Sequence, residues 1–353
     1  MPVAVRQDHF GTLPDGTAVP RYTLDNGRGL SAEVIPLGGI VLKLIVPDRS
    51  GNGRNVVLAP ANVSQILENK TQYLGALIGR VGNRTGNAAF TLDGHTYTLN
   101  ANDGPHSLHG GKVGYDKRMW TVDVIDAGNV ASAIKLSLID PAGTEGYPGT
   151  VNIEVVYTLT ADNAWRIDYT ATTDAATPIN LTHHAYFNLR DAGESTVLDH
   201  EAKLHAASYT PSDATLLPSG EIVPVAGTPF DYCTGKPIGR DFDRLDNTPR
   251  GVDHNFVVDG PAGTLRAAAE IREPVTGRTM SVWTTEPGIQ FYTGNFLDGT
   301  ITDGGGLAFK QHTGFCLETQ GFPNAANTPG FPSIILKPGQ TLRSTTEYRF
   351  GTA

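Results

Sequence analysis

Apolar and polar residues alternate with a period of two along most of this chain, a pattern typical of half-buried β-strands. The alternation predicts strands over residues 31–37, 40–46, 121–126, 134–139, 151–159 and 164–172. A hairpin is expected over 89–99, because Asp93-Gly94 suits a two-residue turn and alternating apolar residues flank it. Helical periodicity is confined to 61–72, which predicts a helix of about three turns at most.

Turn residues separate the predicted strands at short intervals, which favours antiparallel sheets. The expected fold class is therefore all-β: a large antiparallel β-sandwich with very little helix. The chain shows no break in composition, no flexible linker and no fixed-period repeat, so residues 1–353 are expected to form a single domain. The turn-rich stretch 208–254 is interpreted as a long surface excursion before a further strand at 255–258.

Composition excludes several classes of protein. The sequence has 27 Lys and Arg against 36 Asp and Glu, a net charge of −9, with no basic run, which excludes a nucleic-acid binder. No apolar run approaches the ~18 residues of a membrane helix.

The N-terminal residues lack the apolar core of a secretory signal, so a cytoplasmic protein is expected. The two cysteines make neither a disulfide framework nor a four-cysteine zinc site, and free thiols in a reducing compartment are expected.

Two adjacent histidines stand out in the segment NLTHHAYFNL, residues 180–189. In a strand the alternation separates two faces, one with His183, Ala185, Phe187 and Leu189, the other with His184, Tyr186 and Asn188. The first face is typical of core, and the second of the wall of a polar cleft. His184 is therefore a candidate for proton transfer and His183 a structural histidine, although His184 as a buried, hydrogen-bonded histidine fits equally well. Side chains that point in opposite directions do not hold one metal ion, so no metal site is predicted.

A single carboxylate interrupts the strand-like segment GFCLETQ, residues 314–320. Glu318 shares a face with Cys316 and Gln320, and its neighbours favour burial. An ionised carboxylate there must be hydrogen-bonded or it costs several kcal/mol. Glu318 is therefore a candidate general base, with a structural ion pair to an arginine as the alternative.

Five further polar residues are candidates for ligand binding, and each has a structural alternative. Asp253 in GVDHNF is also a suitable turn former, and Gln290 orients hydroxyl groups or completes a hydrogen-bond network. Asn83 and Arg84 lie in a glycine-rich turn, where Arg84 is either a binding or a surface residue. His109 precedes two glycines, which let the backbone approach a ligand or simply make a turn.

Several enzyme motifs are absent from the sequence. It contains no G-x-S-x-G nucleophile elbow, no P-loop, no G-x-G-x-x-G opening a helix and no H-E-x-x-H. These absences disfavour a serine hydrolase of that type, a nucleotide-binding enzyme and a zinc protease.

Taken together and in order, the segments resemble the aldose 1-epimerase, or galactose mutarotase, family over nearly the whole chain. The resemblance is carried by FGTLPDG (10–16), GRVGNR (79–84), HTYTLNANDGPHSLHGG (95–111), DKRMW (116–120), EGYPG (145–149), NLTHHAYFNL (180–189), VDHNF (252–256), QFYTGNFL (290–297), ETQGFPNAAN (318–327) and LKPGQ (336–340). The sequence departs from the family's usual pattern at His183, Asn324 and Thr85, none of which is a proposed catalytic position.

The resemblance implies a β-sandwich enzyme that interconverts the α and β anomers of free aldoses such as galactose and glucose, without a cofactor. His184 matches the family's general acid and Glu318 its general base. The sugar-binding positions match Asn83, Arg84, His109, Asp253 and Gln290. The expected partner is a small-molecule aldose, without nucleic acid or membrane, and the expected state is a monomer or weak homodimer.

Three alternatives of the same fold are weighed against this function. A hexose-6-phosphate 1-epimerase needs extra basic residues for the phosphate, and no such cluster is evident. A non-catalytic carbohydrate-binding domain has no reason to keep Glu318 and His184 together. A glycoside hydrolase needs two carboxylates, for which Glu318 and Asp253 are the available pair.

Overall fold

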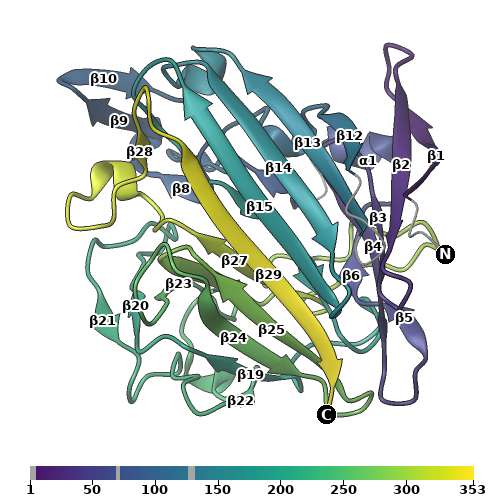
Figure 1. The fold of residues 1–353 in the computed structure, drawn as a ribbon. Coiled ribbons are helices and arrows are strands. Elements are labelled where there is room, and N and C mark those ends of the chain that lie inside the picture. Colours follow the sequence, from purple (N-terminus) through teal and green to yellow (C-terminus); the bar gives the residue numbers. More distant parts are fainter. Residues whose placement is uncertain (1–4, 69–71, 126–131) are drawn as a thin grey trace.

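A nine-stranded antiparallel sheet forms the largest layer of the protein (Figure 1). The computed structural model describes residues 5–68, 72–125 and 132–353. In sheet order the strands are β12 (Thr121–Ile125), β13 (Ser132–Asp140), β14 (Val151–Leu159), β15 (Ala164–Thr173), β29 (Leu342–Thr352), β25 (Arg278–Thr284), β24 (Arg266–Arg272), β19 (Glu201–Leu204) and β22 (Lys236–Pro237). The predicted strands 121–126, 134–139, 151–159 and 164–172 are thus confirmed, except that residue 126 lies outside the described residues.

A second, seven-stranded sheet packs against the first. Its order is β21 (Val223–Pro224), β20 (Ser208–Thr210), β23 (Asp253–Val257), β26 (Gly288–Tyr292), β27 (Phe315–Gln320), β18 (Tyr186–Phe187) and β6 (Val57–Leu58). The Tyr348 hydroxyl of β29 donates to the Leu317 carbonyl of β27 over 2.9 Å, and Phe187 of β18 packs against the Tyr348 ring. These contacts join the facing layers, so the predicted antiparallel sandwich is confirmed.

A five-stranded sheet covers one side of this sandwich, where Figure 1 shows its strands in purple and indigo. It contains β1 (Arg6–Thr12), β2 (Ala18–Asp25), β3 (Ser31–Val34), β4 (Val41–Pro47) and β5 (Gly53–Asn55). The remaining strands form two-stranded pairs: β7 (Leu77–Ile78) with β17 (Thr182–His183), β8 (Arg84–Thr85) with β11 (Ser107–Leu108), β9 (Ala89–Leu92) with β10 (His95–Thr98), and β16 (Thr177–Pro178) with β28 (Ile335–Leu336). The pair β9–β10 is the hairpin predicted around Asp93-Gly94.

Helix is scarce in the described part of the chain. A single α-helix is found there, α1 (Val63–Leu67), besides short 3-10 turns. It is five residues long, begins where the Asn62 side chain accepts the Gln65 amide hydrogen, and is shorter than the prediction for 61–72, of which residues 69–71 lie outside the described residues. No helix in the described ranges is long and apolar enough to cross a membrane.

Two predictions about strand continuity need correction. The segment 180–189 is not one strand, because it leaves β17 after His183 and enters β18 at Tyr186. The excursion 208–254 is mostly turns as predicted, but short strands β20, β21 and β22 tie it to both large sheets, and β23 begins at Asp253 rather than at 255. Backbone pairing, which single-residue patterns do not reveal, decides both outcomes.

Candidate active site

Glu318 lies in β27, an interior strand of the seven-stranded sheet. All six residues of β27 are buried, which explains the continuous apolar character around this carboxylate. Its Oε2 has no hydrogen-bond partner among the residues that the structure describes, while Oε1 lies 3.7 Å from Nε2 of His184. Burial first, and then the negative charge of Asp253, raise the pKa of Glu318 well above its usual value. The structural ion pair with an arginine is not formed, and a carboxyl group with an unused oxygen is left at the wall of a cavity.

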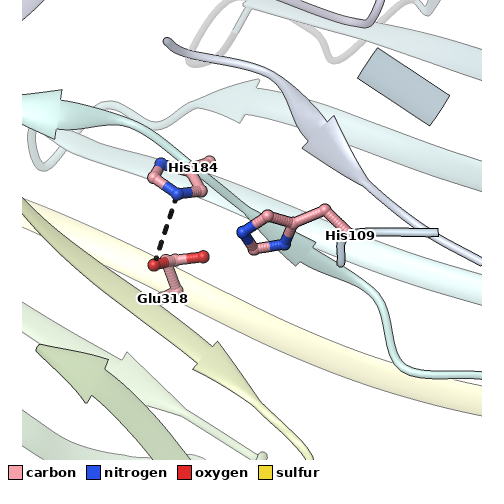
Figure 2. Close-up of side chains that lie close together, drawn as sticks. All are labelled: His109, His184 and Glu318. Atoms are coloured by element: carbon pink, nitrogen blue, oxygen red, sulfur yellow. Dashed lines mark ion pairs between the residues drawn. The ribbon is translucent and has the colours of Figure 1, made fainter. Parts of the chain in front are cut away.

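His184 occupies the break between β17 and β18 and is held there by its main chain. Its N–H donates to the Ala76 carbonyl over 2.9 Å, and its carbonyl accepts the Gly75 N–H over 3.0 Å. The imidazole stacks with the rings of Tyr186 and Tyr73, at centroid distances of 5.0 and 5.8 Å. Burial lowers the pKa of His184 to about 3, so the ring is neutral at physiological pH. The residue thus presents a neutral imidazole to the carboxyl group of Glu318 (Figure 2).

His183 points into the core, as the alternation predicts. Its ring meets Trp165 edge-on at 4.8 Å and Tyr157 at 5.7 Å, and neither ring nitrogen has a hydrogen-bond partner in the described part of the chain. The assignment of Asn188 to the cleft wall is wrong: its side-chain amide donates to the carbonyls of Ser195 and Thr313. Because the strand breaks between His183 and Tyr186, the alternation does not continue from His184 to Asn188, and the two side chains do not share a face.

His109 reaches the same space from a turn in the left-handed region, with φ of 52°. The Asn83 N–H donates to its Nδ1 over 3.1 Å, and the His109 N–H donates to the Asn83 carbonyl over 3.0 Å. The following Gly110 allows this turn, because a Cβ there would lie 2.0 Å from the Gly79 carbonyl oxygen. Since Nδ1 accepts a hydrogen bond, the proton of the neutral ring sits on Nε2, where His109 acts as a donor.

Asn83 and Arg84 line the cavity beside His109. Asn83 adopts φ of 60°, which asparagine tolerates, and its side-chain oxygen accepts the Arg84 N–H over 2.8 Å. The Arg84 guanidinium donates to a carboxylate oxygen of Asp103 over 2.7 Å, so it is a partly buried, paired group and not a surface arginine. The turn thus supplies one cation to the cavity wall.

Asp253 and Gln290 lie on neighbouring strands, β23 and β26, and contact each other. The Gln290 amide donates to Oδ1 of Asp253 over 2.6 Å, and Gln290 stands directly opposite Glu318 in the register of β26 and β27. Burial raises the pKa of Asp253. Asp253 lines the cavity, whereas the side chain of Gln290 contacts Asp253 and is not part of the cavity wall.

These side chains surround a cavity of about 210 Å³, and Figure 2 shows the carboxylate and both imidazoles directed toward a common space. Six of the seven predicted site residues line it: Asn83, Arg84, His109, His184, Asp253 and Glu318. Other residues that line the cavity, among them Gln72, Tyr73, Asp103 and Phe296, do not stand out in the sequence. Asp103-Gly104 was visible as a turn signal, but nothing in the sequence indicates that the Tyr73 ring stacks with His184.

The chain matches the family model described as aldose 1-epimerase over residues 20–349. The protein belongs to the aldose 1-epimerase family. It is 42% identical over 352 residues to galactose mutarotase of Sus scrofa, covering 99% of this chain and 100% of that protein. It is 35% identical over 341 residues to aldose 1-epimerase of Escherichia coli (strain K12), covering 96% of each.

A solved structure supports this assignment to the aldose 1-epimerase family. The GalM/aldose epimerase homologue from C. elegans superposes with a TM-score of 0.87 and 29% identity, covering 95% of this chain and 100% of that one. The three departures from the family's usual residues all lie outside the cavity wall. His183 is in the core, Thr85 is a buried residue of β8, and Asn324 accepts the Gly86 N–H with its side-chain oxygen.

Among the described residues, the one group that resembles a metal site consists of His109, His184 and Glu318. Their potential ligand atoms lie within 4.8 Å of one another. The donor set nevertheless does not fit an ion, because Nδ1 of His109 accepts the Asn83 N–H and the Nε2 lone pair is therefore occupied by a proton. A metal at this place requires His109 to lose that hydrogen bond, and His184 with Glu318 alone provide only two ligands.

Proposed function

We propose that the protein is an aldose 1-epimerase that interconverts the α and β anomers of free hexoses such as galactose and glucose. The observation that carries the proposal is the pair Glu318 and His184, with Oε1 and Nε2 3.7 Å apart in a small polar cavity. The relatives named galactose mutarotase and aldose 1-epimerase, aligned along nearly the whole chain, support the same reaction. An isomerase of this type needs only proton transfers.

The proposed mechanism begins with the hydroxyl group at C1 of the bound sugar. Glu318 takes the proton of this O1 hydroxyl while the bond between C1 and the ring oxygen breaks. Negative charge builds on the ring oxygen, which receives the proton from Nε2 of His184 while Glu318, 3.7 Å away, passes the O1 proton on to Nε2, so that the imidazole stays neutral. The open aldehyde then rotates about C1–C2, and closure on the other face runs the same proton transfers in reverse. Each positioned acid or base typically contributes ~10²–10⁴ in rate.

The other cavity residues have the chemistry to hold the sugar during this rotation. His109 offers a donor at Nε2, Arg84 offers further guanidinium hydrogens, and Asp253 offers a carboxylate acceptor. Asn83 positions His109 through its backbone, and Gln290 positions Asp253 through the 2.6 Å hydrogen bond. We therefore assign the first three to direct contact with sugar hydroxyls and the last two to support.

The geometry of the cavity supports the three alternative functions less well. A phosphate needs a free cation, yet Arg84, the one cationic side chain on the described cavity wall, is paired with Asp103. A glycoside hydrolase needs two available carboxylates, and Oδ1 of Asp253 is already bonded to Gln290. A sugar-binding domain without catalysis gains nothing from burying Glu318 with an unpartnered oxygen.

The reaction is tested by the rate of anomer exchange. Freshly dissolved α-galactose and α-glucose should reach anomeric equilibrium much faster with the protein than without it, followed by polarimetry or by exchange NMR. The 6-phosphates should turn over far more slowly, because the cavity offers them no unpaired cation. A higher kcat/KM for a 6-phosphate would favour the sugar-phosphate epimerase, and no acceleration for any aldose would refute the proposal.

Activity should survive exhaustive chelation. We expect EDTA treatment to leave kcat and KM for galactose unchanged, because the His109 tautomer opposes metal binding and the mechanism moves only protons. Enzyme assayed before and after dialysis against EDTA gives the comparison. Loss of activity that a divalent ion restores would mean that His109 and His184 are ligands.

The pH profile should reflect Glu318 and not His184. A base is active when ionised, so kcat/KM should fall as pH drops through the pKa of Glu318, which burial places above its usual value near 4.5. His184, with a pKa of about 3, should add no limb above pH 4. Measurement of kcat/KM from pH 4 to 9 tests this, and an acid limb that persists unchanged in Glu318→Gln would contradict it.

Three further expectations remain proposals. A single domain over 1–353 is supported by one hydrophobic cluster that joins residues from Tyr22 to Phe350. The monomer or weak homodimer and the cytoplasmic location rest on the sequence reasoning alone.

A further inference from the structure

Nδ1 of His184 lies 3.5 Å from the Sγ of Cys316, and the main chain of His184 itself is also within its reach. Cys316 lies in β27 two residues before Glu318, opposite Tyr186 of β18 and Tyr292 of β26. Residues two apart in a strand share a face, so β27 places a thiol at Nδ1 and a carboxyl group at Nε2 of the same ring. The proposed function uses the carboxyl group and leaves the thiol unassigned.

The Cys316 thiol keeps its hydrogen and is able to donate it to Nδ1 of His184. The residue is fully buried in a cluster with Leu58, Tyr186 and Tyr292. Burial first, then the charges of Glu318 and Asp253, raise the pKa of Cys316 well above its usual value, so the sulfur keeps its hydrogen. A thiol is a weak donor whose burial costs little, and Nδ1 is the partner that the geometry provides.

The neutral His184 ring carries one proton, which can sit on either nitrogen. A proton on Nδ1 would have the Cys316 sulfur, a weak acceptor, as its partner, whereas a proton on Nε2 points toward Glu318 Oε1. The competing acceptor near Nδ1 is the main-chain carbonyl of His184 itself, which already accepts the Gly75 N–H over 3.0 Å and would have to accept a second hydrogen bond. The arrangement therefore favours the proton on Nε2.

We propose that Cys316 is a positioning residue whose thiol donates to Nδ1 of His184 and so keeps the ring proton on Nε2, facing the cavity. Its catalytic consequence rests on the proposed function, in which that proton goes to the ring oxygen. A carboxylate at Nδ1 would instead hold the proton there and stabilise the imidazolium ion. A neutral thiol selects the tautomer without adding charge to a cavity that already holds Glu318 and Asp253.

The tautomer is measured directly in the wild-type protein. Long-range ¹H–¹⁵N correlation NMR separates protonated from unprotonated ring nitrogens, and the His184 signals are assigned by their loss in His184→Asn. We expect Nδ1 unprotonated and Nε2 protonated, without bound sugar and at neutral pH. Wild-type Nδ1 found protonated would overturn the proposal, and this result needs neither a variant nor an active enzyme.

Three variants then test the thiol as the cause. Cys316→Ser keeps a hydroxyl donor, whereas Cys316→Val and Cys316→Ala remove the donor, the former with a larger side chain and the latter with nearly the volume of serine. We expect the serine variant to keep the tautomer, and the other two to show mixed tautomers with kcat lowered about 3- to 10-fold at unchanged KM, as for loss of one net hydrogen bond. Cys233→Val is the matched control, since Cys233 bonds the Ala206 carbonyl and does not line the cavity.

The outcomes separate this inference from the proposed function. A His184 tautomer that is unchanged in both Cys316→Val and Cys316→Ala would refute the positioning role, even if kcat fell. A tautomer that responds to Cys316 in a protein without anomer exchange would refute the proposed function and leave the positioning role standing. Rescue by serine together with loss in alanine excludes a merely structural effect, because serine and alanine have nearly the same volume and differ in the hydroxyl donor.

Discussion

Glu318→Gln is expected to lower kcat for anomer exchange by at least ~10², with KM changed much less. Glutamine keeps the shape and reach of the side chain, so sugar hydroxyls still find partners, but the amide does not take the O1 proton. Initial rates over a range of galactose concentrations, by polarimetry, separate the two constants. A kcat within a few fold of wild type would mean that Glu318 is not the base.

The same substitution should not weaken the fold. The pKa of Glu318 is raised in the folded protein, so above the unfolded value near 4.5 its ionisation opposes folding, and the neutral amide removes that cost. At pH 7 we therefore expect the Tm of Glu318→Gln to equal or exceed that of wild type. Glu347→Gln is the matched control: Glu347 pairs with Arg166 and Arg349 on the nine-stranded sheet, and its loss should lower Tm and leave kcat unchanged.

Period-two alternation predicted the layers of this fold because it reports which side of a strand is buried. Strands β14 and β15 follow the prediction to within one residue, since each has one face on the core between the sheets. The seven-stranded sheet was harder to predict, because its strands β6 and β18 are two residues long. Such strands are defined by pairing with distant segments, which leaves no periodic signal in the local sequence.

Some residues of the candidate site could likewise be predicted from the sequence, and others could not. His184 was separable from His183 by alternation, and Glu318 was conspicuous as the one charge in a buried strand. Tyr73 was not predictable, because its ring reaches His184 from a left-handed backbone conformation more than a hundred residues away in sequence. Gln290 was expected among the sugar-binding residues, and only the register of β23, β26 and β27 shows that it contacts Asp253 and stands opposite Glu318.

His184→Asn and His183→Asn form a pair of substitutions, identical in chemistry, on adjacent residues. The first should lower kcat by at least ~10², because asparagine does not give its proton to the ring oxygen, while KM changes little. The second should leave kcat near wild type and at most lower Tm, because His183 contacts Trp165 and Tyr157 in the core and no cavity atom. The loss in the double variant Glu318→Gln/His184→Asn should be smaller than the product of the single losses, because both groups act in one ring-opening event. Abolished turnover in His183→Asn with activity kept in His184→Asn would reverse the assignment of the acid, whereas fully multiplicative losses would place the two groups in separate steps.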